Sequence, residues 1–329
     1  MQYSGCSDLP VPPVALAELL FNYILTNRRF SNMIIWQRRL PLKNSSIFEL
    51  FLLAFLAFCT TQFSCNSRAK ASYPSPPGYN LNKPIVYTLP DILKEISGII
   101  YYKKDSSLFA INDEKGWLFK IHLGLPVRVE RWKFSNAGDY EDLALKDSTF
   151  YVLKSKGVIE KFRFTSGDSL VLQSFKVPEI GNEFETLYFD STEKRLILIC
   201  KNCVGDKKKQ VSSWSFDPVT DSFAKSFTIE TSKIKEQLND DELKFKPSAA
   251  AYHPITGELY IIASVNSALV ILNKDHTVKG SYRIDPALFK QPEGMTFTPK
   301  GDLIISNEAS ERGAADILFF KYAKISKPQ

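Results

Sequence analysis

Acidic and amide side chains recur at matching positions along the sequence, where together they could bind a hard metal ion. Three short apolar segments each begin with a glutamate, and further oxygen-bearing residues follow two other segments. The complete set of candidate ligands is Glu141, Glu185, Glu293, Asp113, Asn307 and Glu308. Carboxylate and amide oxygens are the ligands that Ca²⁺ prefers, and gathered carboxylates repel one another unless a cation lies among them. These residue types predict a Ca²⁺ site if the fold brings them together.

A structural role is the alternative for the three glutamates. Each carboxylate could accept hydrogen bonds from backbone N–H groups where its own segment begins. Such a role would recur with each repeat of the chain and would need no ion.

Signatures of common catalytic sites are absent from the sequence. It contains no Gly-x-Ser-x-Gly elbow, no His-Glu-x-x-His pair and no P-loop. The three histidines, His122, His253 and His276, stand apart from one another, and we interpret them as structural or solvated residues. Lys154 and Lys156 are the basic residues near the acids that we identify as candidates to hold a phosphate. This pattern favours a role other than catalysis.

The segments that carry the acids belong to an internal repeat. Similar phrases begin at five positions with spacings of 44, 44, 63 and 45 residues. They are SGIIYY at Ser97, EDLALK at Glu141, ETLYFD at Glu185, SAAAYH at Ser248 and EGMTFT at Glu293. Each is followed by a turn rich in Asp, Ser, Thr or Gly and then by two more short apolar segments, which is typical of an antiparallel meander. Repeats of this length built from short strands are typical of β-propeller blades.

The repeats predict an all-β fold, a β-propeller of five blades. A sixth blade that has diverged beyond recognition is the alternative. The last repeat lacks an outer strand, and residues 84–89 (PIVYTL) can supply it and close the ring. Because strand direction alternates within a blade, the starts of the first strands and the loops between second and third strands share one face. The acids should therefore meet at the mouth of the central channel.

The longest spacing contains an insertion. Residues 232–244 have Ile234, Leu238 and Leu243 at helical spacing among many charges, which predicts a short surface helix. The alternative is that the same segment acts as a functional lid, because long loops often carry function.

The first 64 residues resemble an export signal. A basic stretch at 38–43 precedes an apolar run at 47–58, which is too short to span a bilayer, and Cys65 follows soon after. This order predicts lipidation at Cys65, although the flanking residues leave plain secretion or an uncleaved anchor open. Met33 is a second candidate start of translation. Residues 65–80 predict a tether, because they are rich in Ser, Pro and Gly, and residues 81–329 form the propeller domain.

Two cysteines remain in the predicted propeller, Cys200 and Cys203. A single Cys-x-x-Cys lacks the second pair of ligands that a structural zinc site needs. In an oxidising compartment a local disulfide is the preferred interpretation, and free thiols or redox or metal chemistry are the alternatives.

The phrases EISGI, AINDEKGWLFKI, DYEDLA, FETLYFD and QPEGMTFTPKGDLIISNE together resemble the SdiA-regulated (YjiK-like) family, over roughly residues 85–322. The resemblance implies an exported or membrane-associated β-propeller and brings no catalytic residues with it. The sequence departs from the family in the insertion before Ser248 and in the Cys200/Cys203 loop.

Two functions are compatible with these features. The first is a lipid-anchored binding or scaffold module of the cell envelope, stabilised by Ca²⁺ and facing the periplasm or the exterior. Its partner would be an unknown protein or small-molecule ligand, and we expect a monomer. The alternative is a calcium-dependent hydrolase of phosphate esters or lactones with its site at the acidic mouth. The chain has a net charge of +6, a surplus too small to predict nucleic acid as a partner.

Overall fold

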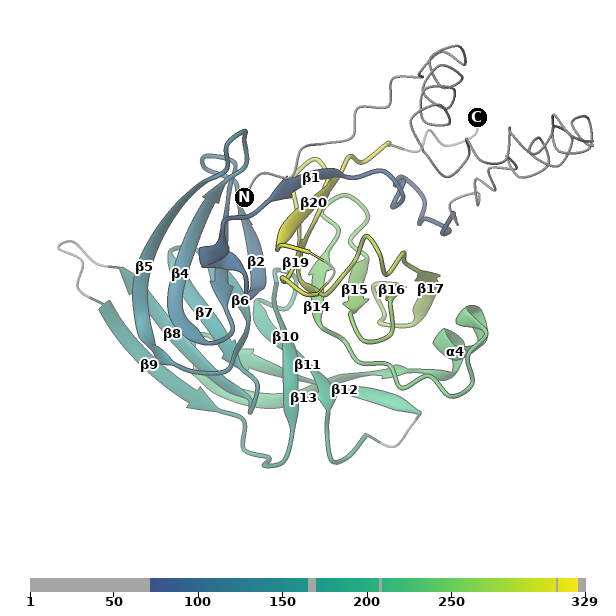
Figure 1. The fold of residues 1–329 in the computed structure, drawn as a ribbon. Coiled ribbons are helices and arrows are strands. Elements are labelled where there is room, and N and C mark those ends of the chain that lie inside the picture. The colour runs from purple at the N-terminus through teal and green to yellow at the C-terminus, as the bar shows by residue number, and fades with distance from the viewer. Residues whose placement is uncertain (1–71, 165–169, 207–208, 312, 325–329) are drawn as a thin grey trace, which may run out of the picture. The chain divides into compact units, whose positions relative to one another are not determined.

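The computed structural model describes residues 72–324, apart from 165–169, 207–208 and 312 (Figure 1). The predicted signal segment at 1–64 and the lipidation site Cys65 lie outside the described residues. Within the described part, no helix combines the length and the apolar composition needed to cross a bilayer.

The described chain forms five four-stranded antiparallel sheets. The first contains β2 (Ile96–Tyr102), β3 (Ser107–Asn112), β4 (Lys115–His122) and β5 (Arg128–Ala137). The second contains β6 (Tyr140–Lys146), β7 (Thr149–Lys154), β8 (Val158–Phe164) and β9 (Leu170–Lys176). The third contains β10 (Glu183–Asp190), β11 (Arg195–Asn202), β12 (Gln210–Asp217) and β13 (Ser222–Glu230). The fourth contains β14 (Ala249–Tyr252), β15 (Leu259–Ala263), β16 (Ala268–Leu272) and β17 (Val278–Arg283). The fifth contains β18 (Pro292–Phe297), β19 (Leu303–Asn307), β20 (Asp316–Phe320) and β1 (Ile85–Thr88).

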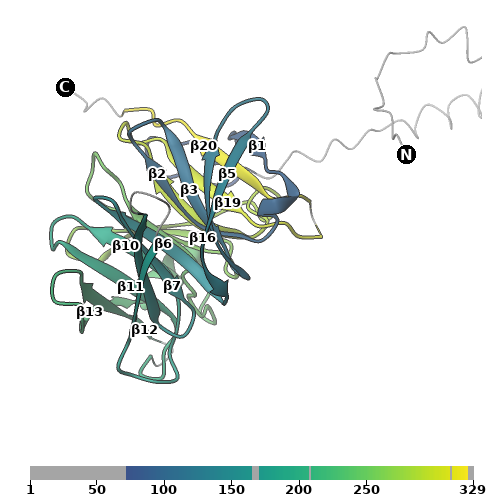
Figure 2. The same ribbon diagram turned by 90° about the vertical axis from the view of Figure 1, so that its left-hand side faces the viewer.

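The first strands of the five sheets contact one another in a closed circle. β2 contacts β6, β6 contacts β10, β10 contacts β14, β14 contacts β18, and β18 returns to β2. The two views in Figures 1 and 2 show the sheets arranged around the axis that these inner strands surround. The prediction of a five-bladed propeller is therefore confirmed, and the structure has no sixth blade within the described residues.

The ring is closed by a strand from the N-terminal side of the domain. β1 pairs antiparallel with β20, from Ile85 opposite Phe319 to Thr88 opposite Asp316. This confirms the prediction that residues 84–89 supply the missing outer strand. The described end of the predicted tether, residues 72–80, also packs on the propeller, because Tyr79 is buried against Tyr260. The tether predicted at 65–80 is thus partly a packed segment, and aromatic burial at Tyr79 is the physical reason.

The core lies between neighbouring blades, which explains the apolar runs in the sequence. Every residue of β3, β15 and β19 is buried, because sheets on both sides cover these strands. The outer strand β9 is mostly exposed. Continuous apolar runs therefore mark the second strands of the blades.

One contact between inner strands leaves no room for a side chain. Asp142 on β6 is buried, and its carboxylate oxygens accept hydrogen bonds of 2.8 Å from the N–H groups of Leu143 and Leu187. A β-carbon on Gly98 of β2 would lie 2.7 Å from the α-carbon of Asp142. Asp142 thus links the second and third blades, and Gly98 allows the first blade to approach them.

We expect Gly98→Ala to destabilise the protein by about 2 kcal/mol, because the new methyl group meets backbone that cannot move without disturbing the ring. Chemical denaturation of both chains measures the difference. Gly205→Ala is the matched control, since a β-carbon there would have no atom within 4 Å. Equal losses for the two variants would contradict the packing argument.

The insertion contains α4 (Ser232–Leu238), which buries Ile234 and Leu238. The helix is shorter than the predicted range of 232–244 because Asn239 adopts a left-handed conformation with φ of 51° and ends it. Leu243 is still buried, but from the segment that follows the helix.

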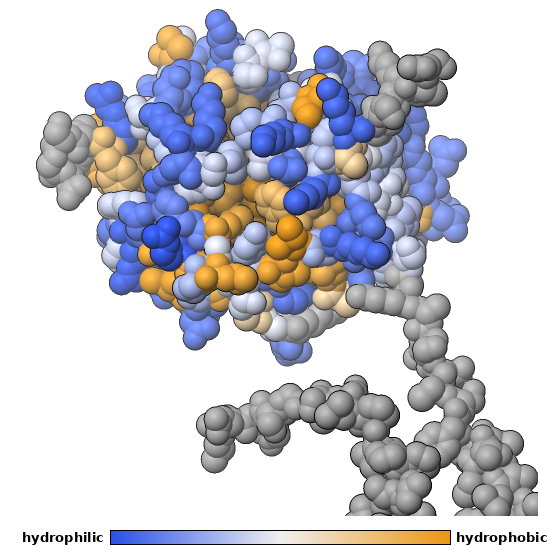
Figure 3. All heavy atoms as spheres, turned by 90° about the horizontal axis from the view of Figure 1, so that it is seen from above, coloured by the Kyte–Doolittle hydropathy of each residue, from blue (hydrophilic) through white to orange (hydrophobic). Residues whose placement is uncertain are grey.

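Apolar side chains gather on one face of an otherwise largely hydrophilic surface, as seen from above in Figure 3. Ile85 and Val86 of the outer strand β1 are among the exposed large apolar residues of the described chain. Their side chains contribute little to the core, so β1 is held mainly through its backbone pairing.

Candidate functional site

Backbone hydrogen bonds hold the loops between second and third strands against the starts of the first strands. Asp113 N–H donates to the carbonyl of Glu95 at 3.1 Å, and Tyr140 N–H donates to the carbonyl of Asp113 at 2.8 Å. In the fifth blade Glu308 N–H donates to the carbonyl of Gln291 at 2.9 Å. These links gather a set of charged side chains that we call the channel mouth: Glu95, Asp113, Glu141, Glu185, Lys201, Glu293 and Glu308.

Three carboxylates of the channel mouth converge. Glu95 lies between the short helix η1 (Asp91–Leu93) and β2, Asp113 lies between β3 and β4, and Glu308 follows β19. One oxygen from each of the three lies within 4.8 Å of the others. Asp113 and Glu308 were predicted ligands, whereas Glu95 was not predicted.

Burial and mutual repulsion disfavour the fully charged form of these three carboxylates. Burial, followed by the neighbouring acids Glu293 and Glu95, raises the pKa of Glu308 to about 8. Burial and then Glu95 also raise the pKa of Asp113. Hydrogen bonds from Lys94 and Glu308 lower the pKa of Glu95, whose carboxylate lies 2.9 Å from the Lys94 ammonium. Of the three groups, Glu308 therefore binds a proton most readily, and Glu95 ionises most readily.

The other three acids of the channel mouth surround a lysine. Glu185 on β10 forms an ion pair with Lys201 on β11, and both side chains are largely buried. Burial raises the pKa of Glu141 to about 8 and that of Glu293 to about 7, while the Lys201 ammonium opposes the shift in each case. Lys201 therefore supplies one of the positive charges that these glutamates need.

The backbone-capping role proposed as an alternative belongs to Asp142, the neighbour of Glu141, which accepts from two backbone N–H groups. Glu293 instead has hydrogen bonds with the side chains of Ser264 and Gln291 that lower its pKa. Glu293 is therefore held by neighbouring side chains, and Glu185 by its ion pair with Lys201.

Asn307 has a structural hydrogen bond on one side of its amide. Its Nδ2 donates to the carbonyl of Leu288 at 3.0 Å and to Asp316 Oδ1 at 2.8 Å. Within the described residues, its Oδ1 has no hydrogen-bond donor, and neither do the buried Oδ1 atoms of Asn112 and Asp113. Buried oxygens of this kind are unusual and are suited to a cation or an ordered water.

Lys154 and Lys156, the candidates for holding a phosphate, are engaged with acids. The Lys154 ammonium lies 3.4 Å from Glu160, and the Lys156 ammonium lies 2.7 Å from Glu183. These two pairs leave the channel mouth without free phosphate-binding lysines from the second blade.

The three histidines have structural contacts. His122 lies 3.0 Å from Glu130 on the neighbouring strand. His253 is buried, and its Nδ1 accepts hydrogen bonds from two backbone N–H groups of the following turn. The ring of His276 stacks on Phe227 with centroids 3.7 Å apart.

Cys200 and Cys203 form a disulfide, with α-carbons 5.7 Å apart. Oxidised sulfur atoms do not act as thiolate ligands, so this pair with the nearby Asp206 is not a metal site in this state. The disulfide spans Lys201 and thereby fixes the backbone from which that side chain reaches the channel mouth.

Comparison with known proteins assigns no family to this chain. No protein-family model matches the chain, and no curated protein matches it. Similar solved structures include a glutaminyl cyclase of Myxococcus xanthus, with 14% identity over 74% of this chain and 97% of that chain and a TM-score of 0.48. Another is the calcium-binding protein regucalcin of Agrobacterium tumefaciens, with 12% identity over 75% of this chain and 95% of that chain and a TM-score of 0.45. A third is a streptogramin B lyase, with 8% identity over 73% of this chain and 98% of that chain and a TM-score of 0.41.

These similar structures are β-propellers, and their low identities and TM-scores transfer no activity. The resemblance to the SdiA-regulated family stays a prediction from its motifs. By its own sheet order the chain is a five-bladed β-propeller with an acidic channel mouth.

Proposed function

We propose that this chain is an exported binding module in which a Ca²⁺ ion, held by Glu95, Asp113 and Glu308, stabilises the channel mouth. The observation that carries the proposal is the convergence of three carboxylate oxygens from separate loops within 4.8 Å. The predicted signal and lipid anchor at Cys65 would place the module at the cell envelope, facing the periplasm or the exterior. Membrane fractionation of a Cys65→Ser variant tests the anchor.

The donor set fits calcium better than a softer metal. Ca²⁺ takes six to eight oxygen ligands, and three carboxylates with waters can provide them. The unpartnered Oδ1 of Asp113 adds an oxygen that no described protein group satisfies. A divalent cation would also oppose the upward shift in the pKa of Glu308, because it stabilises nearby carboxylates in their charged form.

We expect calcium to raise the melting temperature of the protein by about 5 °C at a concentration about 100 times the dissociation constant. The rise should be lost in Asp113→Asn and in Glu308→Gln, because each change removes a charged ligand. Differential scanning calorimetry with calcium or with EDTA measures it.

Glu236→Gln, an exposed change on α4, is the control that should keep the full calcium effect. A melting temperature that does not respond to calcium in the parent chain would refute the metal site. A calcium effect that survives in both ligand variants would place the ion elsewhere.

A second function is favoured by the pKa values of Glu141 and Glu293. Values of about 8 and 7 lie close to physiological pH, where a carboxyl group works best as a general acid or base. Next to a cation site, such groups suit hydrolysis of phosphate esters or lactones. A screen with p-nitrophenyl phosphate and a γ-lactone, with and without calcium, distinguishes the two functions. Turnover that depends on calcium and is lost in Glu293→Gln would establish the hydrolase.

A further inference from the structure

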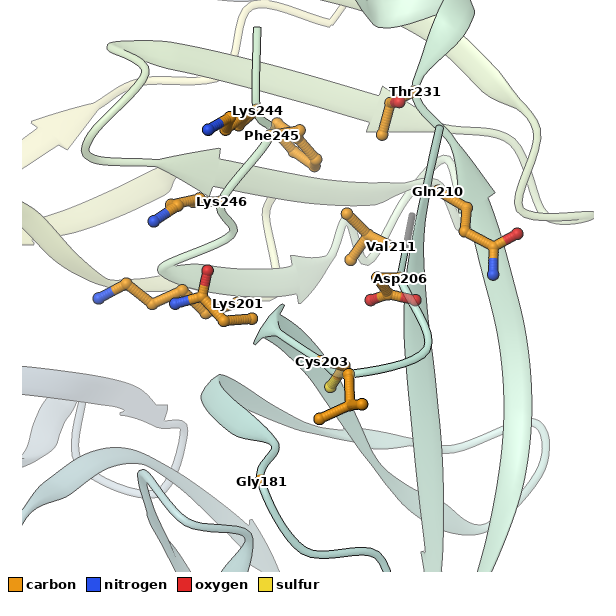
Figure 4. Close-up of a pocket in the computed structure, with 12 residues that line it drawn as sticks. Gly181, Lys201, Cys203, Asp206, Gln210, Val211, Thr231, Lys244, Phe245 and Lys246 are labelled. Atoms are coloured by element: carbon orange, nitrogen blue, oxygen red, sulfur yellow. The ribbon is translucent and has the colours of Figure 1, made fainter. Parts of the chain in front are cut away.

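A second pocket, which shares Lys201 with the channel mouth, lies between the third blade and the segment that leads from α4 to the fourth blade (Figure 4). Its volume is about 330 Å³, which is at the small end of the range for small-molecule sites. Its walls include residues from the end of β11 and the loop after it, from β12 and from the segment between α4 and β14. None of the three carboxylates proposed to hold calcium lines it.

The inner surface of the pocket is apolar. Phe245 and Val211 line it, and both are almost fully buried in the fold beneath. The disulfide residue Cys203 lies beside them. Asp206 also lines the pocket, but its carboxylate accepts hydrogen bonds from the backbone N–H and the hydroxyl of Ser212. The pocket therefore offers an apolar surface with one acid that is already engaged.

Three lysines line the same pocket. The side chains of Lys201, Lys244 and Lys246 extend to one side of it in Figure 4. Glu185 neutralises Lys201. Within the described part of the chain, the ammonium groups of Lys244 and Lys246 take part in no ion pair. In Figure 4 these two side chains extend away from the Phe245 ring, so two positive charges are available at the edge of the pocket.

The backbone that carries these lysines is fixed. Arg283 binds Asp240 at 2.7 Å, which holds the segment after α4 against β17. Lys246 lies six residues after Asp240 on the same segment, and its N–H donates to Asn266 Oδ1 at 2.9 Å. On the opposite wall, Val204 N–H donates to Asn182 Oδ1 at 3.1 Å, and the disulfide restrains the loop. The pocket is therefore largely preformed, which lowers the entropic cost of binding.

We propose that this pocket binds a small organic anion, either a carboxylate or a phosphate ester, with a short apolar body. The anionic group would lie between Lys244 and Lys246, and the apolar body would lie on Phe245 and Val211. Lysine ammonium groups bind such anions as point charges. Contact with the apolar surface adds affinity that inorganic ions would lack. This site is independent of the proposed calcium site and extends the function of the module to ligand capture.

Isothermal titration of the full chain with benzoate and with phenyl phosphate tests the proposal, with benzyl alcohol as the neutral analogue. We expect both anions to bind and benzyl alcohol to bind at least tenfold more weakly. The double change Lys244→Met and Lys246→Met should lower the affinity for both anions at least tenfold, with the larger loss of affinity for phenyl phosphate. Comparison of the two probes decides whether a carboxylate or a phosphate is preferred.

Lys233→Met on α4 is the matched control, since it removes an exposed lysine that does not line the pocket. It should leave both affinities unchanged. Methyl NMR of the unmodified chain keeps the test valid if the double variant does not fold: the signals of Val211 should shift with benzoate, and those of the exposed Val171 should not. No binding of either anion, unchanged affinity in a folded double variant, equal binding of benzyl alcohol, or shifts away from Val211 would each overturn the proposal.

Discussion

Lys201→Met is expected to destabilise the propeller by about 3 kcal/mol at pH 8 and by much less at pH 5. Lys201 is paired with Glu185 in a largely buried position and lowers the pKa of both Glu141 and Glu293. Without the ammonium group, three carboxylates at the channel mouth lose their compensating charge. At pH 5 they bind protons at little cost, whereas at pH 8 the folded chain must either keep them charged in a buried site or bind protons that the unfolded chain does not bind, and both cost stability.

The pH dependence of stability follows from the number of protons that the folded and unfolded chains bind. In the unmodified protein the pKa values of Glu141 and Glu293 are about 8 and 7, above the ordinary value of 4.5 that applies in the unfolded chain. The folded state therefore binds more protons between these values, and its stability falls as the pH rises from about 4.5 to 8. Loss of Lys201 raises both pKa values further, so the decline becomes steeper and extends to higher pH.

Urea unfolding at the two pH values measures the effect. Lys225→Met is the control, because its ion pair with Glu179 is exposed and should contribute less than about 1 kcal/mol at either pH. If Lys201→Met were equally damaging at pH 5 and pH 8, the alkyl chain of Lys201 would matter through packing and its charge would not.

Deletion of residues 72–89 from the full chain should cost at least about 5 kcal/mol, which is close to the whole stability of many domains. The deletion removes β1 and with it the backbone pairing that completes the fifth sheet. It also removes three buried apolar side chains, Tyr79, Leu81 and Leu89, each of which contributes about 1.5–3 kcal/mol when fully buried.

Circular dichroism and thermal unfolding of the purified deletion variant provide the measurement, with loss of cooperative unfolding as the expected result. Val86→Thr is the comparison, since it changes an exposed side chain of β1 and keeps the backbone. It should alter stability by no more than about 0.5 kcal/mol. A deletion variant with an unchanged melting curve would show that the ring does not depend on its closing strand.

The fold could be predicted because it is repeated. The same strand and turn chemistry occurs five times, so that one irregular blade does not hide the pattern. Even the closing strand at 85–88 followed from counting the strands of the last repeat. The end of α4 could not be predicted from apolar spacing alone, because Leu243 continues the pattern although Asn239 has already ended the helix. The burial of Tyr79 could not be predicted, because the residues around it have the composition of a linker.

The acids of the site could be predicted in part. Strand direction predicts that Glu141, Glu293 and Glu308 share one face, and the Glu293 carboxylate raises the pKa of both of the others. Glu95 and Lys201 were missed for different reasons. Glu95 lies before its strand begins, and tertiary contact with Asp113 brings it into the cluster. Lys201 lies near the end of a second strand, as Asp113 and Glu308 do in their blades. It was not predicted because a metal site calls for acidic ligands, and a lysine is not one of them.

The pairing of β1 with β20 also has a kinetic consequence. The two strands come from opposite ends of the domain and are separated by more than two hundred residues, so the last sheet cannot form until the chain has been made almost to its end. Contacts of such long sequence separation form slowly. Nascent chains that have made only four blades would keep an open ring with unpaired edges. Completion of the fold therefore waits until nearly the whole domain has been synthesised, and the four earlier sheets must persist until then without the contact that closes the ring.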